Sequence, residues 1–129
     1  MVNQIQWYGQ CKRVVLHIYE GNTTWESFLD MATQSAEMLN SVNYPVQIIV
    51  NRLNAKFPEF QPTKMTAIND LVPKNQDLVI VVGAEYTVEM LSKVVGRRIA
   101  PQAFTVNTYY VSSMDEAHKV LKQERDIEL

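Results

Sequence analysis

The sequence has few of the residues from which covalent cross-links and metal sites are built. Its 129 residues include one cysteine and two histidines, which excludes a disulfide within the chain and a metal site made of several thiolates. The net charge is −2, whereas a nucleic-acid-binding protein needs a concentrated basic surface. We therefore expect a protein with no cofactor and no metal that does not bind nucleic acid.

Long apolar runs are also missing. No run approaches the roughly 18 residues that a helix needs to cross a bilayer, and the first ten residues, MVNQIQWYGQ, lack the pattern of a signal peptide. What the chain does contain, 47% hydrophobic and 20% charged residues, is typical of a globular protein. The length suits one domain, residues 1–129. We expect a cytoplasmic protein without a transmembrane segment.

Two short strands open the chain. Ile5 and Trp7 alternate with polar residues, and Val14, Leu16 and Ile18 repeat the two-residue period of a strand. The link between them is too short for a helical crossover. The pattern therefore predicts an antiparallel hairpin.

Strands and helices then alternate strictly. The runs VQIIV (46–50) and LVIVV (78–82) are typical of buried parallel strands, the second at the centre of the sheet, and a fifth strand is predicted at 104–111. Amphipathic helices are predicted at 23–43, 62–72 and 84–99, and from residue 113. The order β-β-α-β-α-β-α-β-α predicts an α/β fold: a single domain with a mixed, mostly parallel five-stranded sheet and flanking helices.

Local signals suggest where two of the helices begin. Thr23 with Glu26, and Ser113 with Glu116, have the spacing of capping boxes. In this motif the hydroxyl and the carboxylate accept hydrogen bonds from backbone N–H groups that have no partner within the helix. The final residues, QERDIEL, are polar and are expected to fray.

Few side chains are suited to catalysis. His17 lies within a predicted strand, and a pair with Cys11 would act as a nucleophile only with the right geometry and a third orienting group. His118 is expected on the exposed side of the last helix. We expect no enzyme, and a small Cys/His enzyme stays open as an alternative. The acidic residues are spread over helix faces rather than clustered as metal ligands are: Glu26, Asp30, Glu37, Asp70, Asp115 and Glu116.

One junction has the outline of an anion site. Gly83 leads the strand 78–82 into a predicted helix, and N–H groups at a helix start can hold an anion. No glycine-rich phosphate loop accompanies it, and Glu85 in the first turn would repel a phosphate. The pattern favours an ordinary strand–helix junction.

The segment NRLNAKFPEFQPTKM (51–65) is predicted to be a loop after the third strand. Loops in this position are where α/β folds usually bind ligands. Phe57 and Phe60 are unusual in such a connection, and they predict either a cap on the sheet edge or a contact surface. A contact surface would also include Asn54.

The helix after this loop begins with hydroxyl groups. Thr63 and Thr66 lie in its predicted first turn. A phosphate on either threonine would meet the positive end of the helix and the side chain of Lys64. Both threonines are therefore candidate phosphorylation sites.

Four segments in this order carry a resemblance to a known family: VVLHIYEGNTTWESFLD, YPVQIIVNRLN, DLVIVVGAEYTVEML and FTVNTYYVSSMDEAHKVL. Together they span residues 3–122 and resemble the SpoIIAA-like branch of the STAS superfamily, the bacterial anti-sigma-factor-antagonist fold. The resemblance implies a regulatory protein that is not an enzyme and binds a protein partner, such as a kinase or an anti-sigma-like protein. It implies a contact surface after the third strand, at Asn54, Phe57, Phe60, Thr63 and Lys64.

The family's antagonists are switched by phosphorylation at the start of the helix after the third strand, usually in an Asp-Ser-Ser-Gly-like motif. Here the corresponding stretch is QPTKM, in which Thr63 supplies the hydroxyl and the aspartate and glycine are absent. In lacking this motif, the chain resembles those members of the family that hold a partner or a small apolar ligand without the phosphorylation switch.

Two questions stay open in the sequence. A carrier or sensor of a small apolar ligand is an alternative function, because methionine side chains adapt to varied apolar ligands. An exposed edge strand beside Trp7 and Tyr8 could pair with a second copy, so the chain is expected to be a monomer or a homodimer. The methionines concerned are Met31, Met38, Met65 and Met90.

Overall fold

The computed structural model describes residues 3–56, 58, 61–83 and 107–129. The predicted helix 84–99, strand residues 104–106, Phe57, Phe60, Glu85 and Met90 lie outside the described residues. The described elements, in chain order, are β1 (Gln4–Trp7), β2 (Val14–Asn22), α1 (Trp25–Asn40), β3 (Val46–Lys56), α2 (Pro62–Leu71), β4 (Gln76–Val82), β5 (Thr108–Val111) and α5 (Met114–Arg125).

The five strands form one sheet in the order β1-β2-β3-β4-β5. β1 runs antiparallel to β2, as the hairpin pattern predicts, and the other neighbouring pairs are parallel. The predicted α/β class and the mixed, mostly parallel five-stranded sheet are therefore confirmed. The middle strand is β3 rather than β4, because β4 has only β5 beyond it.

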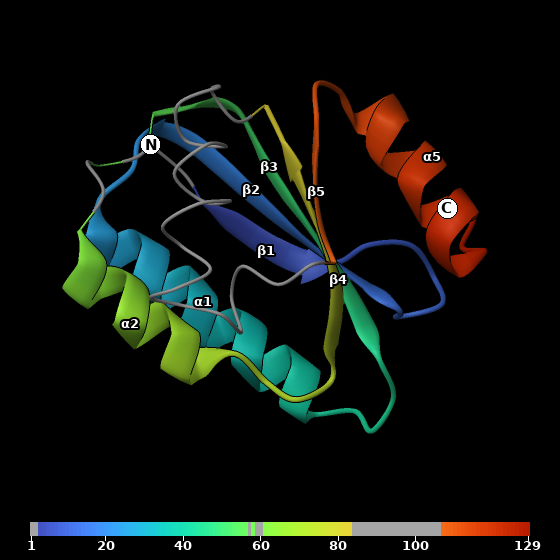
Figure 1. Ribbon diagram of the computed structural model, residues 1–129, viewed down its shortest axis with the longest axis horizontal. Helices are drawn as coiled ribbons and strands as arrows, with labels where there is room; N and C mark the ends of the chain where they lie inside the picture. Colours follow the sequence, from blue (N-terminus) through green and yellow to red (C-terminus); the bar gives the residue numbers. More distant parts are fainter. Residues whose placement is uncertain (1–2, 57, 59–60, 84–106) are drawn as a thin grey trace.

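Helices lie on both sides of this sheet (Figure 1), with α1 and α2 on one face and α5 on the other. The units β2–α1–β3 and β3–α2–β4 each step to the next strand in the same direction. Right-handed crossovers then put both helices on the same face.

The alternation of side chains along the strands divides the core into two layers. On the α5 face, Leu16, Ile49 and Ile80 pack with Leu121 of α5. On the other face, residues one position away, such as Ile48, pack with α1. Side chains on neighbouring strand residues point to opposite faces, so one sheet supports both cores.

Helix α1 begins one residue later than the capping-box prediction places it. Thr24 is the N-cap, and its hydroxyl accepts from the backbone N–H of Ser27. The prediction of a Thr23–Glu26 box is wrong because the backbone N–H of Thr23 donates to the Lys56 carbonyl at 2.7 Å. Thr23 is therefore bonded to the end of β3, one residue past the end of β2.

The last helix begins as predicted, with one difference. The Ser113 hydroxyl accepts from the backbone N–H of Glu116 at 3.2 Å. The Glu116 carboxylate accepts from the backbone N–H and the hydroxyl of Ser112 instead of closing the box on Ser113. The cap is built, but from three residues instead of two.

The C-terminal residues do not fray, contrary to the prediction from their polarity. Asp126 ends α5 in a left-handed conformation with φ 54°, and Ile127 then turns into the core, where it is 3% exposed. Lys122 holds the turn through ion pairs to Asp126 and Glu128 at 2.6 and 2.9 Å. One apolar residue in a polar tail is enough to dock it.

Candidate functional site

The third strand continues six residues past its predicted end, into the segment expected to be a loop. Its last pair with β4 is Asn51 with Val82, whereas its pairing with β2 resumes at Asn54 and runs to Lys56. The prediction that Asn51–Lys56 is a loop is wrong, because β2 also continues and supplies a partner strand. We call residues 20–22 and 52–56 the β2–β3 arm. Its three last residue pairs span roughly 10 Å at the usual rise per residue of a strand.

The arm begins at a bulge. The β2–β3 register shifts by one residue between the pairs Ile18–Asn51 and Glu20–Asn54. A bulge bends a strand and increases its twist. The Leu53 N–H donates to the Asn51 side-chain oxygen at 3.1 Å instead of joining the ladder.

The arm exposes an apolar side chain among polar ones. Leu53 is 48% exposed and is one of two large hydrophobic residues exposed in the described part of the chain, the other being Leu129 at 46%. Asn54 and Lys56 on β3, and the three β2 residues Glu20, Gly21 and Asn22, are exposed as well. The arm therefore presents one apolar side chain on an otherwise polar, exposed surface.

Gly83 fixes the place where β4 leaves β3. Its φ is +85°, and a Cβ built there would lie 3.0 Å from the Leu53 Cα. Its N–H donates to the Val111 carbonyl of β5 at 2.9 Å. The chain at Gly83 therefore lies against the bulge of the β2–β3 arm.

The other half of the predicted surface is the start of α2. Thr63 and Thr66 are exposed and Lys64 is half-buried. The N-cap residue Gln61 makes no side-chain capping bond, and Pro62 follows it at the first helical position, as its missing N–H favours. The structure thus puts Asn54, Thr63 and Lys64 on the two elements that flank residues 57–61, while Phe57 and Phe60 lie outside the described residues.

Two buried polar side chains at this end of the sheet were not found by sequence reasoning. Arg52, at the bulge, is 5% exposed. Thr23 is 5% exposed, and its hydroxyl has no hydrogen-bond partner within the described residues. The burial of Arg52 could have been predicted from its position, because it continues the two-residue alternation of Ile48 and Val50 beyond the apolar run.

His17 is paired with a serine rather than with the cysteine. Its Nε2 lies 3.0 Å from the Ser35 Oγ on α1, and both residues are buried. Cys11 is exposed in the loop between β1 and β2. Ser35 was missed, although the i, i+4 spacing of Met31, Ser35 and Leu39 puts it on the buried stripe of α1.

His118, expected to be exposed, is half-buried. Its Nε2 lies 2.9 Å from the Tyr8 hydroxyl, and the two rings are 5.7 Å apart. This contact ties α5 to the end of β1.

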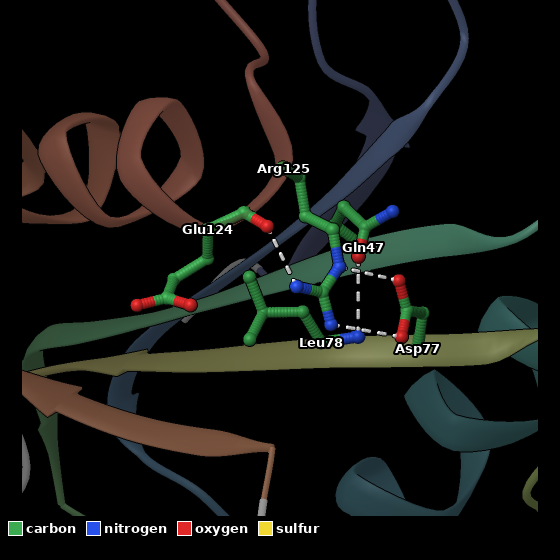
Figure 2. A network of polar contacts seen from close by, with 5 residues as sticks. All are labelled: Gln47, Asp77, Leu78, Glu124 and Arg125. Atoms are coloured by element: carbon green, nitrogen blue, oxygen red, sulfur yellow. Dashed lines mark hydrogen bonds and ion pairs between the residues drawn. The ribbon is translucent and has the colours of Figure 1, made fainter.

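A polar network at the opposite end of the sheet is structural (Figure 2). Arg125 Nε and Nη2 donate to the two Asp77 carboxylate oxygens at 2.6 and 3.0 Å. The Gln47 side-chain oxygen accepts from the Leu78 N–H at 3.2 Å. The hydrogen bond from Arg125 holds the pKa of Asp77 below its ordinary value. We call the Arg125–Asp77 pair the α5 clasp, because it joins the last turn of α5 to β4.

Within the described ranges, no three His, Cys, Asp or Glu side chains come together as a metal site would require. Among the same residues, none of the helices has both the length and the apolar character needed to cross a membrane. No protein-family model matches the chain, and no curated protein is significantly similar to it.

Proposed function

We propose that this chain is a non-catalytic regulatory module that binds a protein partner. The contact surface would be the β2–β3 arm together with the start of α2, including Asn54, Phe57, Phe60, Thr63 and Lys64. The observation that supports it most is the exposure of Leu53, 48%, on a strand extension whose neighbours in sequence are polar. Its relation to the SpoIIAA-like branch of the STAS superfamily, with a kinase or anti-sigma-like partner, is part of the proposal.

The parallel geometry of the arm adds support. Parallel strands are usually covered on both faces. Here three consecutive residue pairs of a parallel ladder, from Glu20–Asn54 to Asn22–Lys56, have exposed residues at five of six positions. Ala55 is the sixth, half-buried position. A bound protein would cover this ladder.

A matched pair of substitutions tests the proposal. Leu53→Ser and Leu129→Ser make the same chemical change at sites of nearly equal exposure, 48% and 46%, at different places in the fold. Each variant and the wild type are used as bait in a native lysate of the source organism. Loss of the same captured protein from the Leu53→Ser bait, with retention on the Leu129→Ser bait, is the expected result. Identical captured proteins on all three baits would refute the contact surface.

The alternative function, carriage of a small apolar ligand, has its own support. Under the seam between α1 and α2, Met65 and Ile68 are buried against the partly buried Trp25, Phe28 and Leu29. Such a cluster of aromatic and methionine side chains suits an apolar ligand. Native mass spectrometry of the purified chain distinguishes the two functions, because a bound small molecule favours the carrier. If no molecule is bound and added lipids do not raise the melting temperature, the protein-binding module is favoured.

Phosphorylation is the third part of the proposal. Thr63 and Thr66 are exposed in the first turns of α2, where a phosphate would lie at the positive end of the helix. Incubation with lysate and ATP, followed by peptide mass spectrometry, would detect the modified threonine. Absence of phosphate on both threonines after capture of a kinase partner would remove this switch from the proposal.

A further inference from the structure

A histidine is enclosed between the sheet and the helix that leads to the proposed contact surface. His17 lies mid-strand in β2, level with Ile5 on β1 and Val50 on β3. It is 6% exposed, and its Nε2 forms a hydrogen bond with the Ser35 hydroxyl of α1. A neutral imidazole and a hydroxyl satisfy each other as donor and acceptor.

None of the neighbouring groups described in the structure is an anion that would balance a charge on this ring. Within β2, Tyr19 contacts it, with ring centroids 6.3 Å apart. The acidic residues of α1, Glu26, Asp30 and Glu37, are all exposed. On β3 the nearest charged residue along the chain is Arg52, a buried cation two positions beyond Val50. A proton on His17 would therefore be a buried charge with no counterion among its described neighbours, which costs much free energy.

Helix α1 connects this histidine with the contact surface. Ser35 lies within it, and Phe28, about two turns nearer its start, stacks on Tyr19. Phe28 and Trp25 in turn pack against Met65 of α2, the helix whose first turn carries Thr63. Displacement of α1 would therefore disturb the start of α2.

The helix on the opposite face is held by different contacts. α5 is fixed by its own apolar cluster, by the α5 clasp and by the Tyr8–His118 hydrogen bond. The pKa of Asp77 lies below its ordinary value because Arg125 donates hydrogen bonds to it. The clasp therefore stays charged in mild acid.

We propose that the α1–α2 layer is an acid-labile element, in which protonation of His17 releases α1 from the sheet while α5 stays docked. Resting on the proposed function, the consequence is that mild acid increases the fraction of molecules in which the contact surface is displaced. Proteins unfold locally as well as globally, and the elements that carry function often belong to the regions of lower local stability.

The size of the effect follows from proton linkage. Burial lowers the pKa of His17 from 6.5 to about 4. Between these values the opened form binds a proton that the closed form does not, so opening becomes more favourable as the pH falls. From pH 7 to pH 5 the opening constant of α1 rises about 20-fold on this basis.

Hydrogen exchange read by mass spectrometry measures the two helices in one experiment on the full chain. Exchange is followed at pH 7 and pH 5 and corrected for the intrinsic rate with an unstructured peptide. We expect the opening constant of the α1 peptides to rise about 20-fold and that of the α5 peptides to change far less.

Two variants assign the effect to His17. His17→Gln cannot take up a proton and keeps a polar group facing Ser35, so the pH dependence of α1 exchange should vanish. Ser35→Ala keeps the imidazole, so the pH dependence of α1 exchange should remain. The exchange of α1 should be faster than in the wild type at both pH values. The wild type alone can overturn the inference. It would do so if the opening constants of the α1 and α5 peptides rose equally at pH 5, or if that of the α1 peptides did not rise. Because no partner is present, this outcome is separate from the lysate test of function.

Discussion

The α5 clasp should be a measurable source of stability. Arg125 and Asp77 make two parallel charge-assisted hydrogen bonds, with side chains 26% and 27% exposed. Hydrogen bonds to charged groups contribute about 1.5–3 kcal/mol, whereas fully exposed ion pairs contribute about 0.2–1 kcal/mol. The partial exposure of both side chains puts the expected coupling free energy between these ranges, at about 1–2 kcal/mol.

The assay is a double-mutant cycle with Arg125→Met and Asp77→Asn, measured by urea unfolding at neutral pH. Each single substitution leaves the other charge half-buried. The sum of the two single losses in the free energy of unfolding should therefore exceed the loss of the double variant, and the difference is the coupling free energy. Lys122→Met is the matched control on the same helix, because it removes two ion pairs between exposed side chains, to Asp126 and Glu128. Exposed ion pairs contribute little, so the urea midpoint should shift much less than in the clasp variants. A coupling free energy indistinguishable from zero would refute the reasoning that the clasp holds α5.

Three further substitutions test single contacts by urea or thermal unfolding. Gly83→Ala should destabilise the chain by more than about 1 kcal/mol, since φ is +85° and the new Cβ would approach the Leu53 Cα; a stability equal to wild type would contradict that conformation. Thr23→Val should stabilise it by about 1 kcal/mol, because it removes a buried hydroxyl without a partner within the described residues. Ser35→Ala should cost about 1–3 kcal/mol by leaving His17 Nε2 without its bond, and a neutral effect would argue for a water in its place.

Lowering the pH below 6.5, the ordinary pKa of a histidine, should reduce the free energy of unfolding. The pKa of His17 is lowered from 6.5 to about 4 by burial, so its contribution is complete above pH 6.5 and is lost as the pH falls toward 4. At about 1.36 kcal/mol per pKa unit, the total is about 3 kcal/mol. Chemical denaturation at pH 7 and 4.5 should show this loss in wild type and a smaller one in His17→Gln. Equal losses in the two proteins would mean that another group titrates.

Much of the fold follows from periodicity in the sequence. The two-residue alternation of Ile5 and Trp7, and of Val14, Leu16 and Ile18, correctly predicts the hairpin β1–β2. The run Val46–Val50 predicts a buried strand, because a parallel strand is covered on both faces. Local composition carries this information, since each face of the sheet imposes its own spacing.

The misses share one physical cause: the deciding partner is distant in sequence. β3 continues to Lys56 because β2 continues beside it to Asn22, and no local pattern in the polar segment NRLNAK indicates that. Ile127 docks because a core exists where α5 ends. The capping prediction shifted by one residue because Thr23 bonds Lys56 across the sheet.

The candidate site was only partly accessible to sequence reasoning for the same reason. Asn54, Thr63 and Lys64 were chosen from their place after the third strand and from a family resemblance. Leu53, the exposed apolar residue beside them, was overlooked, because exposure depends on which strand lies next to it. The Cys11–His17 pair was suggested by nearness in sequence, whereas the strand direction turns His17 toward Ser35 of α1.

The central claim, that the β2–β3 arm and the start of α2 form the contact surface, is tested most directly by backbone NMR of the labelled chain. Once a partner has been captured, it is titrated into the chain and amide shifts are mapped. The account predicts that the largest changes occur at residues 20–22, 52–56 and 63–66, with α5 unaffected. Changes confined to α5 and the C-terminal residues, with the arm unchanged, would contradict it.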